Sequence, residues 1–197
     1  MKTLTTRRTM LRLLPIALWA LGTSGGRAET PLEAMMRAMA QVRESRADFQ
    51  EQKAMPELAM PFPSTGTLHW VAPDRLEKHT LDPVEEILRI EGDRLLLERP
   101  REGVRREISL DQSPDIRPLV EIIRAPLAGD LATLRRYYDI AFEGSLREGW
   151  RMRLTPLTER LRVAVQSVEL TGQGTAIRTL DIRASEGETQ MRITPAS

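Results

Sequence analysis

The sequence predicts a mainly β protein with some helix, in which a strongly curved antiparallel sheet, an incomplete β-barrel, is covered by a helical lid. Three observations predict this fold class. About eleven runs of alternating apolar and polar residues follow one another, which is typical of antiparallel strands with one buried face. Pro, Gly and Asp residues separate the runs, as turn residues do. So large a sheet cannot lie flat and open, so it must curl or stack, and the few helical patterns that accompany it favour a strongly curved sheet.

Composition and charge exclude several function classes. The chain of 197 residues contains no cysteine, which removes disulfides, thiolate metal sites, a cysteine nucleophile and lipid attachment through cysteine. Aromatic residues make up only 4%, so the sequence shows no evident base-stacking platform. Residues 1–28 hold five of the 29 basic residues and none of the 28 acidic ones, which leaves 24 basic side chains and a net charge of −4 in the remainder. We therefore expect no nucleic-acid partner.

The N-terminus has the pattern of an export signal. Basic residues lie between Lys2 and Arg12, an apolar run follows at 13–21, and Gly26 and Ala28 are small residues of the kind that a signal peptidase recognises. The apolar run is shorter than the roughly 20 residues that a spanning helix needs. We expect cleavage near Ala28 and a periplasmic mature protein.

The organisation predicted from this signal is simple. Residues 1–28 form the signal peptide, and residues 29–197 form one domain. Arg7 and Arg8 also resemble a twin-arginine signal, so both the general secretory route and the twin-arginine route stay open.

The mature chain begins with a predicted amphipathic helix. Thr30 can cap it, Pro31 suits its first position, and Glu33 can close a capping box. The apolar positions at helical spacing are Leu32, Met35, Met36, Met39 and Val42. A methionine-rich face of this kind either packs in a core or adapts to a variable ligand, because thioethers repack easily.

The strands follow in two groups. They lie at residues 45–53, 65–71, 74–81, 84–91, 94–99 and 104–110, and then near 140–142, 150–154, 163–170, 176–182 and 191–193. Charged residues alternate with the apolar ones and form an outer face: Arg75, Glu77, Arg89, Arg94, Glu98, Arg105 and Glu107. Pro61 and Pro63 argue against a central strand, so an edge segment or a flap is expected before residue 65.

Two helices separate the groups of strands. Residues 113–129 carry a broad apolar stripe, and Pro126 is expected to end that helix. A short helix is expected at 131–137, after the break at Gly129.

The few helices cannot fill the whole apolar face of such a sheet, so a cavity is expected between sheet and lid. A cavity lined by aliphatic side chains suits an apolar ligand. The expected wall residues are Phe49, Leu68, Trp70, Leu76, Leu88, Ile90, Leu95, Leu97, Ile108, Phe142, Trp150 and Met152. The expected lid residues are Met35, Met36, Met39, Leu119, Ile122, Ile123 and Leu127.

No catalytic constellation accompanies these residues. His69 and His79 are the only histidines, and no third metal ligand is implied beside them. Ser109 and Ser167 have no histidine placed to activate them. We therefore expect no enzyme, no metal and no cofactor.

Several motifs together resemble a known family. They are Phe49-Gln50-Glu51-Gln52-Lys53, Gly66-Thr67-Leu68, Gly92-Asp93, the run from Ile122 to Asp130, and the run from Trp150 to Pro156. In order and spacing they resemble the LolA type of periplasmic outer-membrane lipoprotein carrier, most closely its LolA-related branch. The resemblance implies an incomplete barrel with a lid. It also implies a monomer that carries acylated cargo, a lipoprotein or a lipid, from a transient inner-membrane donor to an outer-membrane acceptor.

One position departs from the pattern of the family. In LolA an arginine stands before the proline that matches Pro73 and bonds the lid shut, whereas this chain has Ala72 there. The sequence therefore leaves open what fastens the lid. It also leaves open a second function on the same fold, an interaction module that senses lipid or misfolded envelope protein and signals to a membrane partner.

Overall fold

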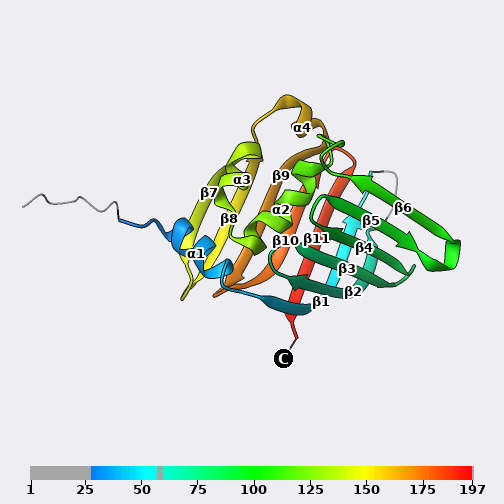
Figure 1. Cartoon of the computed structure of the whole chain (residues 1–197), viewed down its shortest axis with the longest axis horizontal. Helices are drawn as coiled ribbons and strands as arrows, with labels where there is room; N and C mark the ends of the chain where they lie inside the picture. Colours follow the sequence, from blue (N-terminus) through cyan, green and yellow to red (C-terminus); the bar gives the residue numbers. More distant parts are fainter. Residues whose placement is uncertain (1–27, 57–59, 197) are drawn as a thin grey trace, which may run out of the picture.

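The computed structural model describes residues 28–56 and 60–196, and the expected signal peptide lies outside these ranges except for Ala28. Its main feature is one sheet of eleven antiparallel strands in the order β6-β5-β4-β3-β2-β1-β11-β10-β9-β8-β7. The two edge strands, β6 and β7, do not pair with each other, so the sheet is open (Figure 1). This confirms the predicted fold class.

The elements have the following bounds. The strands are β1 Glu44–Ala54, β2 Phe62–Val71, β3 Arg75–Asp82, β4 Glu86–Glu91, β5 Arg94–Arg99, β6 Val104–Ser109, β7 Tyr138–Ser145, β8 Gly149–Pro156, β9 Val165–Gln173, β10 Ala176–Ala184 and β11 Gly187–Pro195. The helices are α1 Pro31–Met39, η1 Pro100–Glu102, α2 Arg117–Ala128, α3 Leu131–Tyr137 and α4 Glu159–Ala164. No helix in the described part of the chain is long and apolar enough to cross a membrane.

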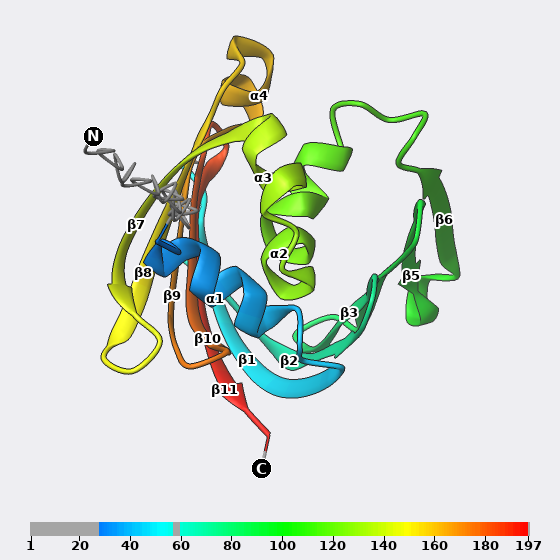
Figure 2. The same ribbon diagram turned by 60° about the vertical axis from the view of Figure 1, so that its left-hand side comes forward.

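The path of the chain explains where the helices lie. Strands β1 to β6 run outward to one edge of the sheet, and β7 to β11 run back from the other edge until β11 pairs with β1. The chain must therefore cross from β6 to β7, and α2 and α3 make that crossing over the hollow side of the curved sheet (Figure 2).

Helix α1 begins as predicted. The Thr30 hydroxyl accepts a hydrogen bond from the backbone N–H of Glu33, and the Glu33 carboxylate accepts one from the backbone N–H of Thr30, so the capping box is complete. The three methionines Met35, Met36 and Met39 are all buried.

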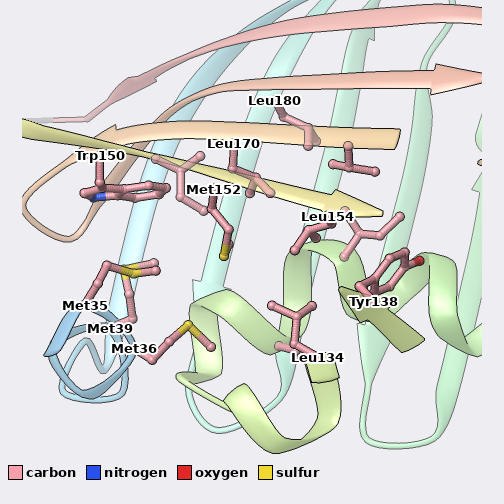
Figure 3. Close-up of a cluster of buried hydrophobic side chains, with 14 of the residues drawn as sticks. Met35, Met36, Met39, Leu134, Tyr138, Trp150, Met152, Leu154, Leu170 and Leu180 are labelled. Atoms are coloured by element: carbon pink, nitrogen blue, oxygen red, sulfur yellow. The ribbon is translucent and has the colours of Figure 1, made fainter. Parts of the chain in front are cut away.

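One half of the hollow side is a solid core. Figure 3 shows the methionines of α1 pointing toward Trp150 and Met152 of β8, with Leu134 of α3 and Tyr138 of β7 beside them. Met152 and Leu134 are fully buried. Side chains of α1 and α3 thus fill this half of the hollow side. A ligand cavity is therefore expected over the other strands.

The register confirms which face of the first strands is apolar. Trp70 pairs with Leu76, Leu76 with Ile90, and Ile90 with Leu95, so all four side chains share the face toward α2. Arg89 lies on the opposite face, where its Nε donates to Glu77 at 2.8 Å. Alternation along strands is therefore a sound guide to the faces of this half of the sheet.

The expectation of an edge segment or a flap before residue 65 is correct only in part, and residues 57–59 of that segment lie outside the described ranges. Pro63 belongs to β2, which lies between β1 and β3. The sheet tolerates it because Pro63 pairs only with Gln52 of β1, and pairing with β3 begins two residues later at Thr65. The missing N–H of proline therefore removes no bond to β3.

Two further element boundaries differ from the expectation. Helix α2 continues past Pro126 and ends at Gly129, whose φ of 69° gives the left-handed conformation that often follows a helix. Val163, expected in a strand, lies in helix α4, which Thr158 caps by accepting a hydrogen bond from the backbone N–H of Leu161. The N-cap signal at Thr158 was present in the sequence.

Candidate functional site

The main cavity lies between α2 and the hollow face of the sheet, and its volume is about 860 Å³. Pockets of roughly 300–1,000 Å³ are typical of proteins that enclose small organic ligands. Its wall is predominantly aliphatic. The sheet side comes from strands β1 to β5 and from β9 to β11, and the lid side comes from α2.

Half of the expected wall residues line this cavity. They are Leu68, Trp70, Leu76, Leu88, Ile90 and Leu95. Leu97 faces the same side as Leu88, with which it pairs, and Ile108 packs against the cluster around Trp70, but neither lines the cavity.

The other expected wall residues lie elsewhere. Phe49, Trp150 and Met152 are buried in the solid core and Phe142 packs against it, and none of the four lines the cavity. Ring stacking between Phe142 and Trp150, with centroids 6.4 Å apart, and the bond from Trp150 Nε1 to the carbonyl of Gly174 at 2.9 Å hold this core together.

The expected lid residues also divide into two groups. Leu119, Ile123 and Leu127 project from α2 into the cavity wall. Ile122 faces the solid core, where it is joined by Met35, Met36 and Met39 of α1. Among the helices, α2 therefore covers the cavity. One apolar face of α2 lines the cavity, and the other packs against the solid core.

Sequence reasoning missed the part of the wall formed by the last strands. Ile177, Leu180, Met191 and Ile193 line the cavity because β11 pairs with β1 and brings β10 and β9 beside it. Alternation places Met191 and Ile193 on one face, but Ile177 and Leu180 are three residues apart and share a face only because the register shifts between Ile177 and Thr179. Nothing local to these strands indicated the shift or the pairing of β11 with β1.

Ionic contacts fasten α2 to the turn between β4 and β5. Arg124 donates to the carbonyl oxygen of Gly92, and Arg117 forms an ion pair with Asp93. Burial alone would raise the pKa of Asp93, but the Ser109 hydroxyl, 2.8 Å away, and the Arg117 guanidinium outweigh it and lower that pKa below its ordinary value of 3.8. The carboxylate of Asp93 is thus kept charged for Arg117.

The sequence left open what fastens the lid, because Ala72 stands where LolA has the arginine that bonds its lid shut. The Ala72 backbone N–H bonds to the carbonyl of Arg43 at 2.8 Å, and the side chain packs against the cluster around Trp70. The ionic contacts of the lid come instead from α2 itself, through Arg117 and Arg124 to the Gly92–Asp93 turn.

Polar residues interrupt the apolar wall at several points, among them Ser45, Thr175 and Lys78. Lys78 lines the cavity, and its Nζ donates to Glu51 Oε2 at 2.5 Å while lying 4.8 Å from the centroid of the Phe49 ring. The Ser64 hydroxyl donates to the same Glu51 oxygen at 3.0 Å. Lys78 is not among the expected wall residues, although its place in the alternation, two residues from Leu76, indicates an inward position.

The histidines lie on the outer face. His69 Nε2 is 2.9 Å from Glu44 Oε1, and His79 Nε2 is 3.4 Å from Glu85 Oε1. Within residues 28–56 and 60–196, no three or more His, Asp or Glu side chains are grouped so that they could hold a metal ion.

A second, polar groove lies on the outer face of β8 to β11, with a volume of about 730 Å³. Asp181 lies in it directly opposite Glu169 of the neighbouring strand. Burial raises the pKa of Asp181 above its ordinary value of 3.8, and the charges of Glu169 and Glu188 raise it further. Like charges placed opposite one another in a sheet are destabilising.

Exchange of Asp181 for Asn should raise the free energy of unfolding at about pH 7 and change it little at about pH 3. The folded protein holds the Asp181 proton more tightly than the unfolded chain, so this group costs stability as the pH rises above 3.8. Urea unfolding at both pH values measures the effect. An equal gain at both pH values would contradict it, because Asn would then act through packing instead of charge.

A curved sheet that encloses an aliphatic cavity beneath a helix is an arrangement that suits an apolar ligand. A family model described as "Outer membrane lipoprotein carrier protein LolA-like" matches residues 27–196. The chain belongs to this family. No match was found among curated proteins.

Solved structures are similar to this chain at low sequence identity. A LolA superfamily protein from Nitrosomonas europaea is 10% identical, with 84% of this chain and 92% of that chain covered and a TM-score of 0.41. A domain described as an outer membrane lipoprotein-sorting protein from Vibrio parahaemolyticus is 9% identical, with 82% and 88% covered and a TM-score of 0.43. LprF from Mycobacterium bovis is 8% identical, with 83% and 91% covered and a TM-score of 0.32.

Proposed function

We propose that this protein is a periplasmic carrier that shields the acyl chains of a lipoprotein or another lipid-linked molecule in its cavity during transport toward the outer membrane. The observation that supports the proposal most is the aliphatic cavity of about 860 Å³ under α2. Each methylene of an acyl chain gains about 0.8 kcal/mol on leaving water, so a chain cannot cross an aqueous gap unshielded. Family membership supports the same proposal.

The two-sided wall suits uptake and release. The sheet side is rigid, because each of its strands pairs with neighbours on both sides. The lid side is a single helix, whose ionic contacts to the β4–β5 turn can open without breaking the sheet. The proposal therefore involves binding alone and no chemical step.

Export and partners complete the proposal. Residues 1–28 would direct the chain to the periplasm by the general secretory or the twin-arginine route, and residues 29–197 would form the mature domain. A monomeric carrier of this kind receives cargo from an inner-membrane donor and passes it to an outer-membrane acceptor.

Purified mature protein should bind a fluorescent fatty-acid probe. Burial of about ten methylenes at ~0.8 kcal/mol each corresponds to a dissociation constant on the order of 1 μM. Fluorescence titration measures this affinity, and mass spectrometry of an organic extract identifies any lipid that copurifies. An empty protein that also takes up no probe would overturn the proposal.

A lipid-transfer assay with the same purified protein distinguishes a carrier from an interaction module. A carrier transfers a labelled lipid from donor to acceptor vesicles. A stable complex with a membrane protein, together with no transfer between vesicles, would favour the sensing module instead.

A further inference from the structure

The register of β2 to β6 arranges the hollow face in rows that change from apolar to charged. The first row lies toward α2 and is mostly buried: Trp70, Leu76, Ile90, Leu95 and Ile108. The second row is only partly covered: Leu68, Lys78, Leu88, Leu97 and Arg106. The third row is mostly polar: Thr80, Glu86, Arg99 and Val104. An amphiphile whose chain lies under α2 therefore has its polar end near the second and third rows.

Three cations stand in the second and third rows, and two of them have carboxylate partners. Lys78 Nζ donates to Glu51 at 2.5 Å, and Arg99 Nε donates to Glu86 at 2.8 Å. Arg106 is exposed, and its guanidinium has no hydrogen bond or ion pair within residues 28–56 and 60–196. The charge of Arg106 is therefore the one in these rows that no carboxylate balances.

Arg106 lies two strands away from the cavity wall. It pairs with Leu97, and Leu97 in turn pairs with Leu88, which lines the cavity. Neighbouring strands are about 4.8 Å apart, so the Cα atoms of Arg106 and Leu88 are roughly 10 Å apart. The curvature of the sheet turns the side chains of its hollow face toward one another (Figure 2). A guanidinium on its long side chain can thus reach an oxyanion at the Leu88 edge of the cavity.

We propose that the cavity takes an anionic amphiphile, whose carboxylate or phosphate group binds the Arg106 guanidinium while its acyl chain lies under α2. The inference rests on the proposed carrier function and specifies its ligand. A guanidinium binds either oxyanion through two parallel N–H···O bonds. A neutral amphiphile fills the same apolar space but lacks this contact.

The place of Arg106 on an edge strand gives a second reason for a charge there. Strand β6 is one edge of the sheet, and inward-pointing charges keep an edge from pairing with another chain. That protective role does not depend on the charge of a ligand. The ratio of the affinities for an anionic and a neutral ligand therefore distinguishes recognition from protection of the edge.

Three ligands with the same alkyl chain length isolate the charge: dodecanoate, dodecyl phosphate and dodecan-1-ol. Isothermal titration calorimetry at neutral pH and low salt gives the three dissociation constants. Wild-type protein should bind both anions roughly 3- to 5-fold more tightly than the alcohol, the upper range for an exposed ion pair. Salt at about 1 M should reduce this preference, because it screens exposed charges.

Three variants assign the preference to residues. Arg106→Gln removes the charge and keeps a polar side chain, so the ratio of anion to alcohol affinity should fall to about 1. Arg105→Gln, on the outer face beside it, removes a cation paired with Glu98 and should leave the ratio unchanged. Lys78→Gln/Glu51→Gln removes an ion pair as a whole and should also leave it unchanged. Each ratio compares ligands on one preparation, so a reduced folded fraction does not alter it.

Each outcome decides for or against the proposal. If wild type binds the alcohol as tightly as both anions, or if Arg106→Gln keeps the full preference, recognition by Arg106 is refuted while the carrier function stands. A preference for one anion alone that Arg106→Gln abolishes supports the proposal and identifies the oxyanion. Loss of the preference only in Lys78→Gln/Glu51→Gln would place recognition at that ion pair and overturn it. If neither the three ligands nor the fluorescent fatty-acid probe bind, the proposed function itself fails.

Discussion

Glutamate in place of Leu68 should weaken binding of the fluorescent fatty-acid probe by about 10- to 100-fold, because an ionised or polar group buried in an apolar site costs roughly 1–3 kcal/mol. Leu68 lies on β2 in the cavity wall. Its neighbour Thr67 is exposed on the outer face of the same strand. Thr67→Glu should leave the affinity within about twofold, because adjacent strand residues face opposite sides.

A second site tests the lid. Ile123→Glu places the same charge in the cavity from α2 and should weaken probe binding to a similar extent. Arg105→Glu, on the outer face of β6, should have little effect. Equal losses from Leu68→Glu, Ile123→Glu and Arg105→Glu would mean that the probe binds elsewhere, for example in the polar groove on the outer face. Circular dichroism and thermal unfolding show whether each variant is folded.

Local patterns in the sequence predict the faces of the strands and the existence of most elements. Leu68, Trp70 and Leu76 alternate with polar residues, and each was placed on the correct side of the sheet because the side-chain period of a strand is two residues. The start of α1 was equally local, because Thr30 and Glu33 lie within one turn.

The division of the hollow face into a core and a cavity was not predictable in this way. Met152 and Leu88 have similar sequence surroundings, yet one is fully buried under α1 and the other lines the cavity. The difference depends on where two helices lie across the sheet: α1, which precedes β1, and α3, which belongs to the crossing from β6 to β7. Binding at the cavity residues stays a prediction until it is measured.

The fastening of the lid was also beyond the sequence. Arg124 and Gly92 are 32 residues apart, and nothing near either one indicates their contact. The resemblance to LolA shows that the lid arginine of that family is replaced by Ala72 in this chain. It does not show which other contacts fasten the lid. The replacement follows from the position of α2, which lies beside the β4–β5 turn.

Loss of Arg124 should produce the largest stability change in the chain, about 3–5 kcal/mol for Arg124→Met, because it leaves a buried carboxylate without its partner. Glu121 is 3% exposed and Arg124 is 8% exposed, and Arg124 Nε donates to Glu121 Oε2 at 3.2 Å. Arg117 has a second, longer contact to Glu121 at 3.8 Å, which limits the loss. Urea unfolding of both proteins gives the difference.

The double variant Glu121→Leu/Arg124→Met separates two causes of this loss. If the cost comes from the unpaired carboxylate, an apolar pair of similar volume should restore most of the stability, since buried ion pairs contribute little beyond their apolar replacements. Equal destabilisation of the single and double variants would show instead that the bond from Arg124 to the carbonyl of Gly92 carries the effect. In that case α2 is held over the cavity chiefly by the β4–β5 turn, and the double variant should also release the fluorescent fatty-acid probe faster than wild type. Retained stability with faster release would assign Arg124 to the lid alone, because opening of the helix and unfolding of the sheet are then separate events.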